Sequence, residues 1–442
     1  MSATRPANRA SARTGAAHRI AALAEDGIGG PLPVRLRAWD GSETGPVGAP
    51  VVVVRSRRAL RRLLWQPGEL GLAQAYVTGE IDVEGDLAQG LRTLWSAARE
   101  RGLHAPKLTP AARARAVAAA VRLGAVGPRP PVPDSQARLR GGLHSRARDR
   151  AAISHHYDLS NDFYRLLLDD TMAYSCGYWT SEDPGADPAD AQRAKLELIC
   201  RKLGLTPGAR LLDIGCGWGS LTLYAAEQHK ARVTAVTLAR EQAAHVREQV
   251  RARGLEDRVE VVCQDYRDIS GAGYDAVATV EMGEHVGDAE YPAFAAALHR
   301  HVRPRGRVLV QQMSRGAHAP GGGAFIEAYI APDMHMRPVG DTVGLLEGAG
   351  LEVRSVESMR EHYVRTVDAW RRTLEDRWAE FVRLTGEETA RVWRLYLVGG
   401  ALAFEERRMG VDQILSVRPA DGGDSGLTGA EAVDWYRNLE ER

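Results

Sequence analysis

The stretch that decides the fold is Leu211-Leu212-Asp213-Ile214-Gly215-Cys216-Gly217-Trp218-Gly219. A short apolar run ends in an acidic residue, and three glycines then follow at every second position. This pattern predicts a buried parallel strand that turns tightly into a helix. Glycine lets the backbone turn sharply and approach a ligand closely, and the N-terminus of the following helix favours a negatively charged group.

The order of residues in this loop indicates which ligand it binds. It reads Asp-x-Gly-x-Gly-x-Gly, which differs from the Gly-x-Gly-x-x-Gly of dinucleotide-binding folds, and it lacks the Gly-Lys-Ser/Thr of a nucleoside triphosphate loop. We therefore expect S-adenosylmethionine as the co-substrate. The alternative is an ordinary strand-to-helix turn, which does not require all of these features together.

Composition and charge describe a globular protein without an obvious partner. The 442 residues are 44% hydrophobic and 26% charged, with 58 Lys and Arg against 57 Asp and Glu. The four cysteines have no C-x-x-C spacing, so the sequence predicts neither a metal site nor a disulfide framework, and a reducing cytoplasm fits. No apolar run approaches the roughly 18 residues of a membrane span, so we expect any membrane contact to be peripheral.

Composition also divides the chain into five parts. In order they are a disordered tail, a small α+β domain, a basic linker, a methyltransferase domain and a C-terminal tail, over residues 1–18, 19–103, 104–150, 151–420 and 421–442. Between residues 107 and 150 there are ten basic residues and only two acidic ones. Such a segment suits an anionic membrane surface, although a solvated arginine-rich linker is the alternative.

The fourth part alternates between strand and helix patterns. Strands are predicted over residues 210–214, 232–237, 259–263, 275–280 and 307–311, and helices over residues 221–228, 241–253 and 291–301. This spacing predicts an α/β fold with a doubly wound, Rossmann-like parallel sheet, as in class I methyltransferases. The ligand is then expected at the carboxyl ends of the strands. Residues 366–409 have helical periodicity.

Polar residues at the strand ends are the candidate cofactor ligands. Thr237 and Gln242 are neutral groups that can hydrogen-bond a ribose, and Asp265 with Tyr266 suits an adenine, with core packing as the alternative for Tyr266. Tyr174 and Ser175 are expected at the methionine end. The full predicted set is Tyr174, Ser175, Asp213, Gly215, Gly217, Gly219, Thr237, Leu238, Gln242, Asp265, Tyr266 and Val280.

A second group of residues carries charge at the end of the fourth strand. Glu281, Glu284 and His285 follow one another closely there, and carboxylates are costly to bury without partners, which argues for a site rather than a solvated loop. Upstream, residues 155–164 and 172–179 combine histidines, aromatic residues and Cys176. A lone thiol is a candidate nucleophile, but it is more often a small buried hydrophobe.

These segments resemble the cyclopropane fatty acid synthase family, which includes the mycolic acid cyclopropane synthases. The matching stretches are His155 to Leu159, Tyr174 to Cys176, Leu211 to Gly219, Asp265 to Asp268, Glu284 to Gly287, and His362 to Thr366 with Trp370. The resemblance covers about residues 150 to 410. Residues before it, including Gly68 to Gly71, resemble the additional lipid-binding domain of the members that act on bacterial phospholipids.

The resemblance implies a reaction and its catalytic groups. An acyl-chain double bond takes the methyl group of S-adenosylmethionine, and a base, thought in this family to be a bound bicarbonate ion, removes a proton from the resulting carbocation. The implied catalytic residues are Cys176, Glu284, Tyr363, Gln311, His156 and Tyr157. Gln311 stands where the family has a histidine, so it can donate a hydrogen bond but cannot carry charge.

Two products follow from this scheme. Ring closure gives a cyclopropane, whereas loss of a different proton gives a methylene branch that a partner reductase converts to a methyl branch. The expected partner is a phospholipid membrane surface with unsaturated acyl chains, reached from the cytoplasm at the inner membrane; a homodimer is left open. A small-molecule or nucleic-acid methyltransferase is the alternative, but no Asn/Asp-Pro-Pro-Tyr/Phe motif supports action on nucleic acid.

Overall fold

The computed structural model describes residues 15–101, 110–137, 161–316 and 323–439. It divides into two compact units, which comprise residues 1–136 with 386–402 and residues 137–385 with 403–442. Helix α16 (Glu387–Glu405) therefore begins in the first unit and ends in the second. Among the described residues, no helix combines the length and the apolar composition needed to cross a membrane.

The first unit has an α+β fold. Its four strands lie in the order β2-β1-β3-β4, with β1 and β3 parallel, and have the bounds β1 (Arg35–Ala38), β2 (Glu43–Thr44), β3 (Val51–Val54) and β4 (Ile81–Glu84). The helices are α1 (Ala16–Ile28), α2 (Arg57–Trp65), α3 (Glu69–Val77), α4 (Leu87–Glu100) and α5 (Pro110–Arg122). Leu36, Val54, Ala59 and Leu123 meet in its core.

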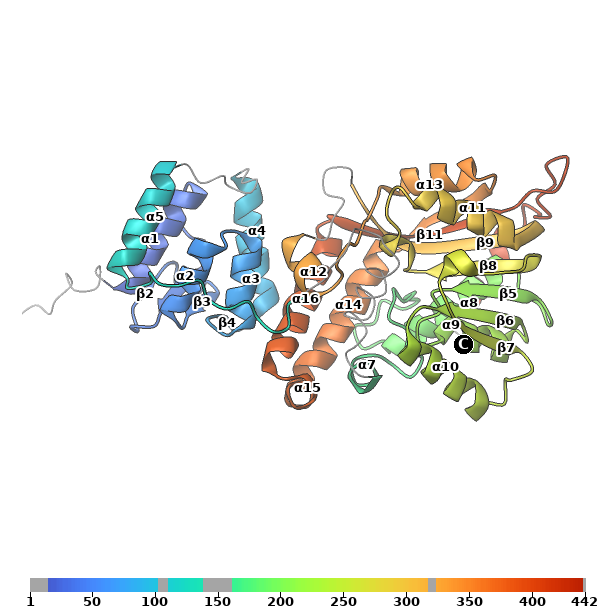
Figure 1. The fold of residues 1–442 in the computed structure, drawn as a ribbon, viewed down its shortest axis with the longest axis horizontal. Coiled ribbons are helices and arrows are strands. Elements are labelled where there is room, and N and C mark those ends of the chain that lie inside the picture. The colour runs from blue at the N-terminus through green and yellow to red at the C-terminus, as the bar shows by residue number, and fades with distance from the viewer. Residues whose placement is uncertain (1–14, 102–109, 138–160, 317–322, 440–442) are drawn as a thin grey trace, which may run out of the picture. The chain divides into compact units, whose positions relative to one another are not determined.

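The second unit contains a seven-stranded sheet in the order β10-β11-β9-β8-β5-β6-β7. The strands are β5 (Arg210–Ile214), β6 (Arg232–Thr237), β7 (Val259–Cys263), β8 (Tyr274–Val280), β9 (Val302–Arg315), β10 (Glu352–Ser358) and β11 (Met409–Val417). The five strands from β5 to β9 are parallel, which confirms the doubly wound sheet (Figure 1). Antiparallel strands β10 and β11 extend it beyond the prediction.

Further helices belong to the second unit, and some of them pack on the two faces of this sheet. They are α7 (Asn161–Leu167), α8 (Pro188–Leu203), α9 (Ser220–Gln228), α10 (Arg240–Ala252), α11 (Tyr291–His301), α12 (Ala324–Tyr329), α13 (Val339–Gly348), α14 (Arg360–Asp376), α15 (Trp378–Thr385) and α17 (Glu431–Trp435). Because side chains alternate along a strand, Leu211 packs among residues of α8, α9 and α10, whereas Leu212 packs among those of α11 and α13.

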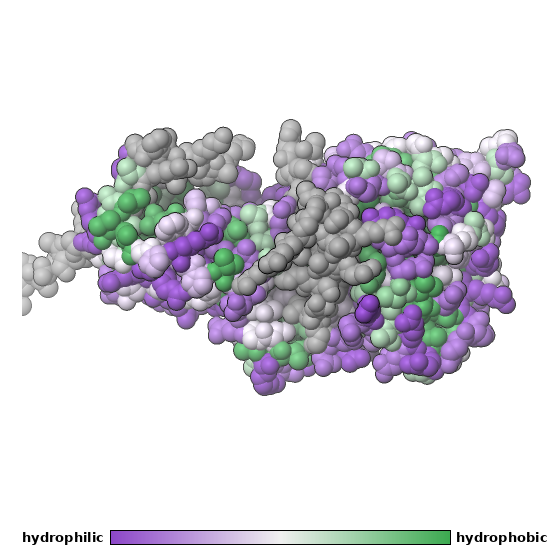
Figure 2. Space-filling model, viewed as in Figure 1, coloured by the Kyte–Doolittle hydropathy of each residue, from purple (hydrophilic) through white to green (hydrophobic). Residues whose placement is uncertain are grey.

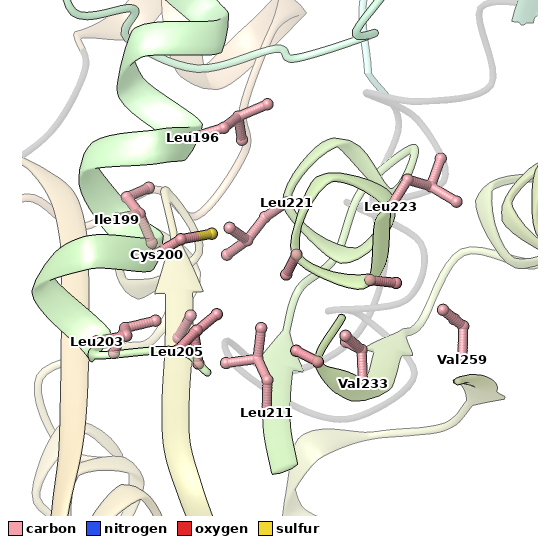
Figure 3. Close-up of a cluster of buried hydrophobic side chains, with 14 of the residues drawn as sticks. Leu196, Ile199, Cys200, Leu203, Leu205, Leu211, Leu221, Leu223, Val233 and Val259 are labelled. Carbon is pink, nitrogen blue, oxygen red and sulfur yellow. The ribbon is translucent and has the colours of Figure 1, made fainter. Parts of the chain in front are cut away.

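Helix α8 packs closely on the first of these faces. In Figure 3 its residues Leu196, Ile199, Cys200 and Leu203 point toward Leu221 of α9 and Leu211 of β5. All of these side chains are buried, and burying one such side chain stabilises a fold by roughly 1.5–3 kcal/mol. This packing fixes the position of α8, which also carries two buried lysines, Lys195 and Lys202.

Candidate functional site

The glycine loop between β5 and α9 lines a pocket at the carboxyl ends of the parallel strands. Gly215, Gly217 and Gly219 all have positive φ, at 81°, 54° and 88°, a backbone region that side chains disfavour. A Cβ on Gly215 would lie 3.0 Å from the Met282 side chain, so the loop passes Met282 only with glycine there. Gly217 lines the pocket, and a Cβ there would meet no protein atom within 4 Å. The loop thus leaves room for a ligand against its backbone.

Most of the predicted cofactor residues surround this pocket. The ones that line it are Tyr174, Ser175, Asp213, Gly215, Gly217, Thr237, Leu238, Gln242, Tyr266 and Val280. Within this set, the Thr237 hydroxyl donates to Gln242 Oε1 at 2.8 Å, and this bond fixes how the Gln242 amide faces. The Asp213 carboxylate accepts from Thr222 Oγ1 at 2.7 Å, and burial raises the pKa of Asp213 to about 6.

Two predicted cofactor residues do not line the pocket. Gly219 caps α9, where a Cβ would lie 3.0 Å from Val246. Asp265 binds the Arg267 guanidinium, with distances of 2.8 Å from Nε and 2.6 Å from Nη2, and also accepts from the Arg267 backbone N–H. Its neighbours Tyr266 and Arg267 line the pocket instead. Asp265 therefore orients Arg267 in this structure.

Helix α8 fixes the segment from Tyr174 to Cys176 at the pocket. Gln192 Nε2 donates to the Ser175 carbonyl at 2.8 Å, and Lys195 Nζ donates to Ser175 Oγ at 2.9 Å. Lys195 is 1% exposed and lines the pocket, although no sequence motif distinguished it. Burial lowers its pKa, and the negative charge of Glu281 opposes this effect. Lys195 therefore places a buried cation beside the predicted methionine end.

Three of the catalytic residues predicted from the resemblance converge on Glu281. Cys176 N–H donates to Glu281 Oε1 at 2.8 Å, and Gln311 Nε2 donates to the same oxygen at 2.9 Å. Tyr363 OH donates to Glu281 Oε2 at 2.5 Å. The Glu281 carboxylate therefore lies among Cys176, Gln311 and Tyr363 and accepts a hydrogen bond from each.

The backbone of Glu281 has an unusual conformation. Its φ is +52°, in the left-handed region that residues other than glycine rarely adopt. The strand ends here, and the Glu281 N–H donates to the Gln311 carbonyl on β9 at 2.6 Å. Such strain persists where the surroundings impose it and is frequent at functional sites. The turn directs the Glu281 side chain to the pocket wall.

Glu284 occupies a different place from the one expected. It is fully buried and does not line the pocket; its Oε1 accepts from the Met313 N–H at 3.0 Å. Burial and the charge of Glu281 raise the pKa of Glu284 to about 8. Burial also raises the pKa of Glu281, but the bonds from Tyr363, Cys176 and Gln311 oppose that rise. Because two adjacent carboxylates do not both ionise readily, the negative charge lies on Glu281 and the proton on Glu284.

The remaining predicted catalytic residues are placed as follows. His156 and Tyr157 lie outside the described residues. The Cys176 thiol is fully buried, and burial with the nearby Glu281 charge raises its pKa well above the ordinary value. The thiol therefore stays protonated. The group of Cys176 that donates to Glu281 is its backbone N–H. His285 lines the pocket, and burial lowers its pKa to about 4, so it is neutral.

Aromatic rings form a continuous series beside the pocket. Trp218 lies 4.2 Å from Tyr164 between ring centroids, Tyr164 lies 5.6 Å from Tyr174, and Tyr174 lies 5.2 Å from Trp370. Trp370 in turn contacts Tyr363, whose hydroxyl binds Glu281. Aromatic faces attract a cation, and a carboxylate lies at the end of this series. The site can therefore stabilise a positively charged intermediate.

Comparison with known proteins identifies the family. The model of the mycolic acid cyclopropane synthetase family matches residues 144–414. The chain belongs to this family. A probable fatty acid methyltransferase of Pseudomonas putida is 35% identical over 400 residues, which cover 88% of this chain and 93% of that protein. The tuberculostearic acid methyltransferase UfaA1 of Mycobacterium tuberculosis is 33% identical, over 88% of each chain.

A solved structure connects the family to the pocket. The mycolic acid cyclopropane synthase CmaA1, determined with SAH (S-adenosylhomocysteine) and CTAB, matches with a TM-score of 0.56 and 30% identity, over 60% of this chain and 97% of that one. Together with the glycine loop, this likeness identifies S-adenosylmethionine as the co-substrate. The protein is thus an S-adenosylmethionine-dependent methyltransferase of the lipid-modifying cyclopropane synthetase family.

Proposed function

We propose that this enzyme methylates the double bond of an unsaturated fatty acyl chain in a phospholipid, and that Glu281 is the base that completes the reaction. The observation that carries the proposal is the seat of the Glu281 carboxylate, which lines the pocket and accepts hydrogen bonds from Cys176, Gln311 and Tyr363. In this proposal Glu281 takes the role of the base that the resemblance implied for a bicarbonate ion.

The pocket residues would hold the co-substrate at its methionine end, its ribose and its adenine. Ser175 and Lys195 would bind the methionine end, and Thr237 with Gln242 the ribose, while Tyr266 and Arg267 would line the adenine end. When bound, S-adenosylmethionine supplies an electrophilic methyl group, whose addition to the alkene leaves a carbocation on the acyl chain. Tyr174 lines the pocket beside the aromatic series and would stabilise that charge together with ionised Glu281.

Both candidate products arise when a proton of the new methyl group passes to Glu281. If the C–H electron pair closes onto the neighbouring cationic carbon, the product is a cyclopropane. If a hydride first shifts to that carbon, the cation moves to the branch carbon and the same proton loss gives a methylene group. We propose the methylene-branched product, because the relatives that match most of the chain are named fatty acid methyltransferases. A partner reductase would then supply the methyl branch.

Product analysis tests this proposal directly. The purified enzyme is incubated with S-adenosylmethionine and vesicles of a monounsaturated anionic phospholipid, with a saturated phospholipid as the control. Cyclopropane and methylene products have the same mass, so the recovered acyl chains are analysed by proton NMR. Vinylidene protons are expected, and only with the unsaturated lipid. Ring protons would show the cyclopropane instead, and methylation of neither lipid would overturn the substrate.

We further propose that the first unit meets an anionic bilayer through exposed apolar and basic residues. Trp65 is 54% exposed and Val126 55% exposed, and Trp65 Nε1 donates to the Gly127 carbonyl beside Val126. Arg122 and Arg129 are exposed on the same segment. Figure 2 shows apolar patches on the surface of this unit. Arg138, Arg140, Arg146 and Arg148, which sequence analysis assigned to the head groups, lie outside the described residues.

A further inference from the structure

A second buried lysine of α8 lies outside the pocket. Lys202 is near the C-terminal end of α8 and is 0% exposed. Its Nζ donates to Gln413 Oε1 at 2.8 Å and forms an ion pair with Glu357. Burying an ammonium group is costly unless it is paired, and Lys202 does not line the pocket. Lys202 has no role in the proposed reaction.

A continuous line of hydrogen bonds runs from Lys202 to the proposed base. Gln413 Nε2 donates to Gln311 Oε1 at 2.9 Å, and Gln311 Nε2 donates to Glu281 Oε1 at 2.9 Å. Gln413 and Gln311 are both 0% exposed. They lie directly opposite each other in the β9–β11 pairing, and Gln311 lies opposite Val280, which precedes Glu281. Sheet register therefore builds the line across β11, β9 and β8.

The chemistry of its two ends gives this line one direction. An ammonium group has only donors and an ionised carboxylate only acceptors, whereas a side-chain amide has a donor end, its NH₂ group, and an acceptor end, its carbonyl. Lys202 therefore requires the carbonyl of Gln413, which turns the Gln413 amide nitrogen toward the carbonyl of Gln311. The Gln311 nitrogen is then turned toward Glu281. Reversing both amides would place an NH₂ group against the ammonium and a carbonyl against the carboxylate, and both contacts are repulsive.

We propose that Lys202 and Gln413 are positioning residues that set the direction of the Gln311 amide, so that Gln311 donates to the Glu281 carboxylate. This inference rests on the proposed role of Glu281 as the base. It also explains how a neutral glutamine serves where the family resemblance implied a histidine. Lys202 is the fixed positive end of the line and contacts β11, two strands away from Glu281. The orientation that it imposes on the Gln413 amide fixes the Gln311 amide, which in turn donates to Glu281.

Kinetics of Lys202→Met and Gln413→Glu test the proposal. The first variant removes the ammonium, and the second keeps a partner for Lys202 but has no donor for Gln311. Losing one hydrogen bond to a charged group should lower kcat by about ten- to a hundredfold in each. The KM for S-adenosylmethionine should stay unchanged. The acidic limb of the kcat–pH profile should move to higher pH, because a carboxylate that loses a donor gains a proton more readily.

A matched control separates positioning from stability. Arg201→Met also removes a cation from α8, one residue away, but Arg201 pairs with Glu197 and carbonyls near α17 rather than with the line. It should keep the parental kcat and pH profile, and thermal denaturation compares the stability of all variants. If Lys202→Met and Gln413→Glu both keep the parental kcat and pH profile, the positioning role is overturned. If Glu281→Gln is defective in the same assays, the proposed role of Glu281 as the base still stands. Parental activity in Glu281→Gln would overturn both.

Discussion

Replacing Glu284 with Gln tests how charge divides between the two buried carboxyl groups. Glu284 is 0% exposed, and its Oε1 accepts from the Met313 N–H at 3.0 Å, whereas its buried Oε2 has no hydrogen-bond partner among the described residues. Burial and the Glu281 charge raise its pKa from the ordinary 4.5 to about 8. Glu284 is thus a neutral acid below about pH 8, and glutamine is a neutral side chain of the same shape.

The sign of the effect on stability follows from proton binding. Between the unfolded pKa of 4.5 and the folded pKa of about 8, the folded chain keeps a proton that the unfolded chain has released. Rising pH therefore favours unfolding across this window, by at most about 5 kcal/mol from this group. Glutamine does not ionise, so Glu284→Gln removes this penalty. Its stability relative to the parent should rise steadily from about pH 5 to about pH 8.

Urea unfolding followed by tryptophan fluorescence measures this difference across the same pH range. Glu256→Gln, at an exposed glutamate, is the matched control and should follow the parent at every pH. The kcat of Glu284→Gln should stay within about tenfold of the parent near neutral pH, since its neutral carboxyl makes no contact with the pocket. A stability difference between Glu284→Gln and the parent that does not change with pH would refute the assignment of the proton to Glu284.

Two further perturbations address the co-substrate and the membrane. Gly217→Val should weaken S-adenosylmethionine binding by at least about tenfold, because Gly217 lines the pocket at φ +54° and a branched side chain is strained there; unchanged affinity by calorimetry in a folded variant would count against this site. Trp65→Ala should weaken sedimentation with anionic vesicles while co-substrate affinity stays parental. The combined change of Arg138, Arg140, Arg146 and Arg148 to Gln should also weaken sedimentation with anionic vesicles, most strongly at low salt. Equal sedimentation of both variants and the parent would assign docking to another surface.

The sequence was sufficient for the features that depend on local pattern. The alternation of strand and helix patterns predicted all five parallel strands, and the Asp213 to Gly219 loop predicted a ligand site where the pocket lies. Strands β10 and β11 were missed because they are antiparallel additions whose pairing depends on tertiary structure. Asp265 was assigned to the adenine, but Arg267 two residues later is its partner, a short-range pairing that the sequence Asp-Tyr-Arg already contained.

The catalytic carboxylate shows where sequence reasoning ends. The resemblance implied that Cys176, Gln311 and Tyr363 act together, and in the structure all three donate hydrogen bonds to Glu281, a residue for which the resemblance implied no role. Both glutamates were visible at the end of the same strand. What selects Glu281 is its positive φ and the register of β8 against β9, and neither can be read from residue types.

The most direct test of the central claim is the turnover of Glu281→Gln on unsaturated phospholipid vesicles, measured beside the parent in bicarbonate-depleted buffer. Removing a general base should lower kcat by about two to four powers of ten, and Glu284→Gln serves as the neighbouring control. The parent should keep its full rate without bicarbonate, because the Glu281 carboxylate occupies the donors of Cys176, Gln311 and Tyr363. A parent that needs added bicarbonate, or a Glu281→Gln variant with parental turnover, would contradict the account.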